Sequence, residues 1–508
     1  MRWATFVTFA VIVFTLTVSA TGALAQDWPT FRNDPRHAGY STSAAPTDNT
    51  LLWSFETGNF VYSSPAFVDG KVFVASFDYN VYCLDENFGD ILWSYQTGDQ
   101  VQSSPTVAGG RVYVGSDDHK VHCLDAETGE RIWRFETGRE VYSSPTVVDG
   151  RVYISSQDEN VYCVDAESGE EIWRFDIGAS LYSSPAVADG KVFVGSYDHK
   201  TYSGNIYAID AESGDNVWSY ETGLEVYSSP AVVDGKVFVG SYDGKVYAIN
   251  AESGTFIWSY QTGQAVASSP AVVDGKVFVG SYDGSVYSLD AESGALLWSF
   301  PTGSTVHSSP AVADGKVFVG SYDGSVYCLD ENSGDLIWSY TTGNPVHSSP
   351  AVANGKVFVG STDHRVYAWG EPVLTVNVEP GGGTVVQGES VAATVTIRAT
   401  GLEEVILSVS GAPADVEVEL AQSSGVRRFS SSMDISTSPS TLTGTYKLTV
   451  SGTAYGRTRT ATYELRVIGF FERILNISLY IIAAAVAIAI ILILIRRRRA
   501  RERQVFFR

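Results

Sequence analysis

Apolar and polar positions alternate along most of this chain in short runs, a pattern typical of β-strands. The segment Val226–Gly263 shows the unit clearly, because the runs VYSSPAV, KVFVGS, VYAI and IWSYQTG are separated by Asp-Gly or Glu-Ser-Gly turns. Asp-Gly between alternating apolar residues predicts a hairpin, since both turn residues can take positive φ. The pattern predicts four short strands, here named A to D, and no long amphipathic helix.

This four-strand unit recurs eight times. Its Ser-Ser-Pro signature places prolines at 65, 105, 145, 185, 230, 270, 310 and 350, in steps of 40 with one step of 45. A four-stranded repeat of about 40 residues predicts the blades of a β-propeller. A lone strand D (51–57) precedes the first strand A, and the last unit (346–369) lacks a strand D. We expect the N-terminal strand to complete the last blade, giving eight blades and a closed ring without an exposed edge. Seven blades and a stray repeat would be the less economical alternative.

One tryptophan recurs in each unit. A four-stranded blade cannot bury both of its faces alone, so a large ring placed once per blade can fill the wedge between neighbours. The segment Ala208–Trp218 (AIDAESGDNVW) resembles the tryptophan-docking motif of the pyrroloquinoline-quinone-like (PQQ-like) β-propeller family, and DWPTFRND at 27–34 resembles the opening motif of that family. The resemblance implies that the following residues pack between blades: Trp53, Trp93, Trp133, Trp173, Trp218, Trp258, Trp298 and Trp338.

The resemblance also raises the question of a quinone cofactor, because the family includes quinoprotein dehydrogenases as well as the assembly factor BamB. The quinoproteins would imply a vicinal Cys-Cys disulfide, a calcium site and a catalytic aspartate inserted into the propeller. Here the four cysteines, at 83, 123, 163 and 328, are never adjacent and share one repeat position. Equivalent positions of different blades are too far apart for a disulfide, so we expect small buried thiols. We expect no PQQ, no other cofactor and no metal.

Segments outside the propeller (51–370) have different patterns. Residues 1–25 combine Arg2, an apolar run and Ala23-Leu24-Ala25, which predicts a cleaved secretory signal peptide, with an uncleaved anchor as the alternative. Residues 26–50 hold the family motif and a polar linker. Residues 371–468 contain short alternating runs such as 390–397 and predict an immunoglobulin-like (Ig-like) β-sandwich, similar to stalk modules of prokaryotic, often archaeal, surface proteins.

The C-terminal region predicts a membrane anchor. Residues 474–495 carry no charge and would span about 33 Å as a helix, enough for a bilayer core. Arginines follow directly, so residues 496–508 should be a basic cytoplasmic tail and the propeller should lie outside. The expected fold is all-β, an eight-bladed PQQ-like β-propeller plus an Ig-like β-sandwich with one C-terminal transmembrane helix. The expected location is the cell membrane, as a single-pass type I protein.

Charge narrows the possible partners. The net charge is −23, and the last 13 residues hold seven arginines and one glutamate, so the rest of the chain carries −29. Phosphate repulsion argues against nucleic acid. An acidic body favours solubility, association with cations, or life at high salt or low pH, and the sequence does not separate these.

Candidate binding residues are those that differ between otherwise similar repeats. The D-to-A and B-to-C loops should share one face of the ring, where propeller loops converge on the central channel. The two residues after each Thr-Gly vary, and so does the residue before Ser-Ser-Pro. The candidate ligand ring at this channel mouth comprises Tyr62, Gln102, Tyr142, Tyr182, Tyr227, His307 and His347. The alternative is that these loop residues vary between repeats because nothing constrains their identity.

Two histidines of this ring raise the possibility of further chemistry. His307 and His347 occupy equivalent positions in adjacent blades and could bind a metal or act in acid–base catalysis, but two ligands alone do not make a metal site. Hydrogen-bonding aromatic residues at a funnel rim are the simpler interpretation.

The function expected from these features is a membrane-anchored, extracytoplasmic β-propeller that acts as a non-catalytic binding or scaffold module for a protein or glycan partner at the cell surface. The alternative is a surface enzyme, a quinoprotein-like dehydrogenase or a carbohydrate-active protein, that uses the channel-mouth face. The sequence leaves the oligomeric state open.

Overall fold

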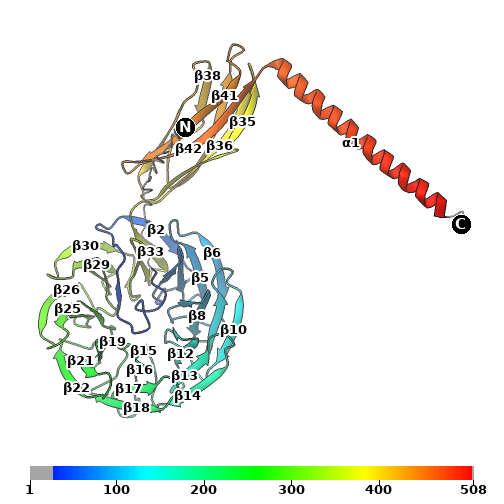
Figure 1. Ribbon diagram of the computed structural model, residues 1–508. Coiled ribbons are helices and arrows are strands. Elements are labelled where there is room, and N and C mark those ends of the chain that lie inside the picture. The colour runs from blue at the N-terminus through cyan, green and yellow to red at the C-terminus, as the bar shows by residue number, and fades with distance from the viewer. Residues whose placement is uncertain (1–26, 506–508) are drawn as a thin grey trace, which may run out of the picture.

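The repeat folds into a ring of eight β-sheets around a central axis, with a second, smaller β-domain and one helix beyond it (Figure 1). This computed structural model describes residues 27–505, and it describes the side chains of the helix at 470, 472–475 and 483–495. The predicted signal peptide, 1–25, lies outside the described residues. The all-β propeller predicted from the repeat is confirmed.

The first four blades each contain four antiparallel strands that run A to D from the axis outward. Blade 1 contains β3 (Ala66–Val68), β4 (Lys71–Ala75), β5 (Asn80–Asp85) and β6 (Ile91–Gln96). Blade 2 contains β7 (Thr106–Ala108), β8 (Arg111–Ser116), β9 (Lys120–Asp125) and β10 (Arg131–Glu136). Blade 3 contains β11 (Thr146–Val148), β12 (Arg151–Ser155), β13 (Asn160–Asp165) and β14 (Glu171–Asp176). Blade 4 contains β15 (Ala186–Ala188), β16 (Lys191–Gly195), β17 (Gly204–Asp210) and β18 (Asn216–Thr222).

The next three blades follow the same plan. Blade 5 contains β19 (Ala231–Val233), β20 (Lys236–Gly240), β21 (Lys245–Asn250) and β22 (Phe256–Gln261). Blade 6 contains β23 (Ala271–Val273), β24 (Lys276–Gly280), β25 (Ser285–Asp290) and β26 (Leu296–Pro301). Blade 7 contains β27 (Ala311–Ala313), β28 (Lys316–Gly320), β29 (Ser325–Asp330) and β30 (Leu336–Thr341), and β1 (Tyr40–Ser41) joins β27 in parallel.

Blade 8 is built from both ends of the propeller sequence. Its strands A to C are β31 (Ala351–Ala353), β32 (Lys356–Ser361) and β33 (Arg365–Gly370), and its strand D is β2 (Leu51–Glu56). β2 pairs antiparallel with β33, with Trp53 opposite Ala368. The predicted closure by an N-terminal strand D is therefore confirmed.

Serines of the Ser-Ser-Pro signature connect the blades at the axis. The second serine of each blade donates its backbone N–H to the hydroxyl oxygen of the second serine in the next blade, at 2.9–3.0 Å. The last bond runs from Ser349 back to Ser64, so the series closes on itself. The first serine accepts from strand B of its own blade, as Ser228 does from Gly240 at 3.0 Å. Strand A is consequently shorter than predicted, because it begins after the proline.

The tryptophans connect the blades farther out. The indole N–H of Trp218 donates to the carbonyl of Ala251 in the next blade at 3.1 Å. Its ring lies against Gly254, which has φ +71°, and a Cβ there would come within 2.7 Å of the ring. Six other tryptophans make the same contact with the next C-to-D turn. The predicted packing between blades is therefore what the structure shows.

The second domain consists of two sheets that enclose one apolar core. One sheet contains β34 (Leu374–Glu379), β36 (Ser390–Ala399), β40 (Arg428–Thr437) and β38 (Val416–Leu420). The other contains β35 (Gly382–Val386), β42 (Arg457–Ile468), β41 (Gly444–Ala454), β37 (Glu404–Ser410) and β39 (Ser424–Val426). The immunoglobulin-like classification stays a prediction.

The second domain is attached at the C-to-D turn of blade 1. Arg398 places its guanidinium 3.9 Å from the centre of the Phe88 ring and forms an ion pair with Asp90. The backbone N–H of Gly401 donates to the carbonyl of Leu52 at 3.2 Å. Six other blades have serine or threonine where blade 1 has Phe88, so this turn differs where the second domain contacts it.

The predicted membrane-spanning helix over 474–495 is corrected by the structure. The chain there forms α1 (Phe470–Val505), whose first turn pairs with the second domain through Glu472–Arg466 and Arg473–Glu389, at 2.7 and 2.6 Å. Within the described residues, no helix is long and apolar enough to cross a membrane.

The serine ring yields a stability prediction. Ser229→Ala removes the acceptor for the buried N–H of Ser184 and should lower the free energy of unfolding by about 1–3 kcal/mol, the cost of an unpaired buried donor. Ser253→Ala, in an exposed turn, is the matched control. Urea unfolding measures both, and equal midpoints for the two variants would contradict the role given to the ring.

Candidate functional site

The two faces of the ring are built from different loops. The D-to-A and B-to-C loops meet on one face, where the N–H of Phe77 donates to the carbonyl of Phe60 at 2.9 Å. The A-to-B and C-to-D turns meet on the other, where the N–H of Glu86 donates to the carbonyl of Gly70 at 3.1 Å. The second domain contacts a C-to-D turn, so its attachment leaves the D-to-A face uncovered.

Residues 27–41, here called the N-terminal plug, close the channel at the turn face. Trp28 pairs with Phe67 of blade 1 through two backbone hydrogen bonds of 2.8 Å. The carbonyls of residues 29, 35, 36, 38 and 39 then accept one backbone N–H each from blades 2, 4, 5, 6 and 7. The plug therefore passes around the axis and contacts one blade after another.

Two basic side chains of the plug are buried under the ring. Arg32 is 1% exposed and donates to the carbonyls of Pro270, at 2.8 Å, and Pro310. Burial lowers the pKa of Arg32 to about 9. Burial and the nearby Arg32 charge lower the pKa of His37 to about 3, so His37 is neutral at pH 7. The prolines of the repeat thus supply carbonyl acceptors to the plug.

The segment after the plug, predicted to be only a linker, replaces a missing turn. Blade 8 has no covalent C-to-D turn, so Trp338 of blade 7 lacks the acceptor that the other tryptophans use. Its indole N–H donates instead to the carbonyl of Pro46 at 3.4 Å, and Asn49 donates to the carbonyl of Ser339 at 2.8 Å. The N-terminal segment therefore covers the seam between blades 7 and 8.

The open end of the channel holds a cavity of about 130 Å³. Phe31 of the plug contributes to its lining, and so do the second serines of all eight blades. All seven residues predicted as a candidate ligand ring line this same cavity: Tyr62, Gln102, Tyr142, Tyr182, Tyr227, His307 and His347. The structure thus brings them together, and their role in binding a ligand stays a prediction.

The two histidines of the ring lie in contact. The ring centroids of His307 and His347 are 3.8 Å apart, and both side chains are half-buried at the channel wall. Desolvation lowers the pKa of His307 to about 4, and desolvation together with the His307 charge holds the pKa of His347 well below 6.5. Both are neutral at pH 7. Among the described residues, no three His, Cys, Asp or Glu side chains are placed to share a metal ion.

Aromatic contacts run around most of the mouth. From Tyr142 they continue through successive ring pairs, with centroids 3.8–5.8 Å apart, to Phe77 in blade 1. The members in order are Tyr142, Tyr182, Tyr227, Tyr242, Tyr282, His307, His347, Tyr62 and Phe77. We call this series the aromatic arc. It is interrupted in blade 2.

Gln102 and Asp117 of blade 2 occupy the interruption. The amide of Gln102 donates to Asp117 Oδ2 at 3.4 Å. The other oxygen, Asp117 Oδ1, is shielded from solvent and has no hydrogen-bond partner among the described residues. Burial is the main cause that raises the pKa of Asp117 to about 6, and the charges of Asp99 and Glu140 add to it.

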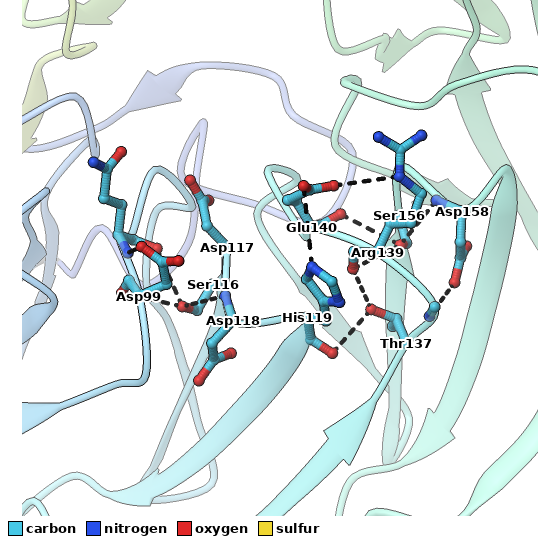
Figure 2. Close-up of polar contacts among 12 residues, drawn as sticks. Asp99, Ser116, Asp117, Asp118, His119, Thr137, Arg139, Glu140, Ser156 and Asp158 are labelled. Atoms are coloured by element: carbon cyan, nitrogen blue, oxygen red, sulfur yellow. Dashed lines mark hydrogen bonds and ion pairs between the residues drawn. The ribbon is translucent and has the colours of Figure 1, made fainter.

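Figure 2 shows the polar groups around this interruption. Asp117 and Glu140 extend to one side of the loops, whereas Asp118 and Asp158 extend to the other (Figure 2). Glu140 lies 3.5 Å from the guanidinium of Arg139 and 4.0 Å from His119. Asp117 extends to the same side as Glu140 but, unlike Glu140, has no cationic partner among the residues drawn (Figure 2).

The aspartates found in all eight B-to-C turns have a structural role in most blades. Asp283 Oδ2 accepts from the N–H of Gly263 at 2.7 Å and from the hydroxyl of Tyr287 at 2.8 Å. In blade 2, His122 takes the place of this tyrosine and bonds Asp118 Oδ2. Burial alone would raise the pKa of Asp118, but hydrogen bonds, above all the one with His122, lower it to about 2. These contacts hold the B-to-C turns in place.

Sequence reasoning missed Asp117, although the repeat contained the signal. The residue before the turn aspartate is Phe77, Gln157, Tyr197, Tyr242, Tyr282, Tyr322 or Thr362 in the other blades. Asp117 is the only acidic residue at this position, and this exception in a B-to-C loop is the signal that identifies it.

The raised pKa of Asp117 predicts a pH-dependent stability effect. Because its pKa of about 6 in the folded protein exceeds the ordinary 3.8, ionisation destabilises the fold as pH rises from about 4 to 6. Asp117→Asn should therefore raise the free energy of unfolding by about 1 kcal/mol at pH 8, after allowance for solvent screening, and leave it unchanged at pH 4. Urea unfolding at both pH values tests this, with Glu130→Gln as control. An Asn variant no more stable than wild type at pH 8 would contradict it.

Comparisons with known proteins agree with this architecture. The sequence matches the family model described as the β-propeller of the β-alanine-activating enzyme, over residues 36–236 and 201–379. No curated protein sequence matches. Solved structures that resemble it include BamB from Moraxella catarrhalis, at 20% identity and TM-score 0.55, covering 64% of this chain and 100% of that one. The quinohemoprotein alcohol dehydrogenase from Comamonas testosteroni has 18% identity and TM-score 0.58, covering 67% and 80%.

These structural likenesses, below 25% identity, concern the fold alone, and they support a PQQ-like propeller. The family model extends over more than half of the chain, including the plug from residue 36, all eight blades and the first strand of the second domain. The chain therefore belongs to the β-propeller family of the β-alanine-activating enzyme.

Proposed function

We propose that this protein is a non-catalytic binding module that holds a protein or glycan partner at the open end of its propeller channel. The observation that carries the proposal is that the two ends of the propeller channel differ in structure. One end is closed by the N-terminal plug, and the other presents a cavity lined by the constant second serines and by the varying residue that precedes Ser-Ser-Pro in each blade. The second domain is attached at the turn face and leaves that opening free.

The chemistry of the opening supports recognition. Tyrosine rings offer large, rigid contact surfaces with a polar tip, and they lose little conformational entropy when a partner binds. The two histidines, neutral at pH 7, offer ring nitrogens as hydrogen-bond acceptors. Such a surface can bury an extended segment of a partner without any reacting group.

The matched family takes its description from an enzyme, but the match concerns the propeller part of that protein. An activity for this chain is thus not part of the proposal. The proposal also keeps the propeller on the extracytoplasmic side, as the signal-like residues 1–25 suggest. N-terminal sequencing of the mature protein tests that placement, with a new terminus near residue 26 as the expected result.

The proposal is tested by variants of the opening. Tyr182→Ala with Tyr227→Ala, and separately His307→Ala with His347→Ala, should each weaken capture of a partner by the purified protein at least about tenfold, because they remove buried contact area at the centre of the surface. Glycan arrays and pull-down from extracytoplasmic fractions provide the partner.

Leu296→Ala with Leu297→Ala is the matched control, since it removes exposed apolar area from the outer strand β26. Loss of binding in the control but not in the rim variants would contradict the proposal.

The enzyme alternative has its own measurement. The binding proposal predicts that the purified chain carries no stoichiometric quinone or transition metal, as judged by absorption spectra and elemental analysis. If the protein carries a bound chromophore or metal, and if the His307→Ala, His347→Ala variant loses both that group and an enzymatic activity, the binding proposal is contradicted and the enzyme alternative is supported.

A further inference from the structure

The mouth of the channel has one sector that differs from the rest. The aromatic arc passes from blade 3 around to blade 1, and its two ends, Tyr142 and the Tyr62–Phe77 pair, lie on either side of blade 2. Gln102 of blade 2 fills the position between them on the cavity wall. A group entering the mouth at this sector would therefore meet an aromatic face on each side and polar atoms in the middle.

The polar atoms of this sector have an unfilled hydrogen-bonding capacity. Asp117 receives one hydrogen bond, from Gln102 to Oδ2, and its Oδ1 accepts none from the described residues while being closed off from solvent. A buried carboxylate oxygen without a donor is costly, so the sector is complementary to a group that brings N–H donors.

The carboxylates around Asp117 come from each of the neighbouring loops. Asp99 in the preceding D-to-A loop, Asp118 in its own turn and Glu140 in the following loop are all acidic. The nearby cations are Arg139, which lies against Glu140, and Lys120, whose ammonium donates to the carbonyl of Asp118 at 2.8 Å. His122 pairs with the carboxylate of Asp118. His119 is directed to Glu140. The local balance is negative, as is the whole chain at −23.

Resting on the proposed function, we propose that this sector receives the alkylammonium or guanidinium end of a basic side chain from a protein partner. The N–H groups would donate to Asp117, whose side chain would turn on binding so that Oδ1, shielded from solvent in the free protein, reaches the mouth. The methylene stem and the charge would lie against the rings of Tyr142 and Tyr62, which attract cations through their faces. The acidic surface would favour encounter with a basic partner.

Two other ligand classes fit less well. A divalent metal would need several converging ligands, and the described residues contain no such group of three. A neutral sugar could stack on the tyrosines, but it would leave the charge of Asp117 unpaired. Binding of a neutral glycan in place of a cation is therefore one of the outcomes that would overturn the proposal.

Small probes with matched neutral isosteres test the proposal on the purified chain. N-acetyl-arginine amide is compared with N-acetyl-citrulline amide, and N-acetyl-lysine amide with N-acetyl-norleucine amide, by titration calorimetry at pH 7.5 and low salt. The cationic member of each pair should bind at least about tenfold more tightly, the size expected of a partly desolvated cation on a ring face beside a carboxylate. The arginine and lysine arms distinguish the guanidinium source from the ammonium source.

Variants then locate the binding. Asp117→Asn should weaken binding of the preferred cation about tenfold or more, and Tyr142→Leu should weaken it severalfold. Glu130→Gln removes the same charge from the opposite face of the same blade and should change nothing. Binding should also weaken about tenfold between pH 7.5 and pH 5, because Asp117 then takes up a proton.

The outcomes separate this inference from the proposed function. Absent or equal binding of the cationic and neutral probes, or equal effects of Asp117→Asn and Glu130→Gln, overturns the cation site. If the tyrosine and histidine rim variants still lose a partner in that case, the binding function stands without the cation. If the rim variants keep the partner, the proposed function fails as well.

Discussion

The hydrogen bond from one blade's serine N–H to the next blade's serine hydroxyl is the contact on which the rest of this propeller depends. It is made at the axis, where the second serines of all eight blades line the channel. Each serine is both donor and acceptor, so no blade can satisfy its own signature alone. The series is complete only when the last blade meets the first, which couples the stability of every interface to closure of the ring.

Closure has a cost at one place, and the N-terminal segment offsets it. Because blade 8 takes its outer strand from the start of the chain, the turn that would receive Trp338 does not exist. Pro46 and Asn49 supply contacts there, while the residues before them cross the axis and close one end of the channel. The same segment that seals the seam thus makes the two faces unequal, and it leaves the D-to-A face as the one where the channel remains open.

Much of the propeller could be predicted from the sequence because the same four-strand pattern occurs eight times. The period, the blade count, the closing strand, the tryptophan contacts and the seven residues of the mouth all follow from comparing one repeat with the next. The path of the plug could not be predicted, because residues 27–41 occur once and their partners are backbone groups of distant blades. Asp117 was missed because the sequence alone does not show that this one acidic exception among the B-to-C loops lies at the gap in the aromatic arc. The membrane span at 474–495 was predicted from an uncharged run of bilayer length followed by arginines, but within the described residues no helix is long and apolar enough to cross a membrane.

The constant residues of the repeat therefore build the ring, and its exceptions at the open end form the candidate binding surface. The most direct measurement is a crystal structure of the chain with 4-bromobenzylammonium, whose bromine is located by anomalous scattering. A single bromine site at the mouth, with the ammonium group at Asp117 and the ring beside Tyr142, is the predicted result. Bromine bound only between the propeller and the second domain, or no ordered site at the mouth, would contradict the account.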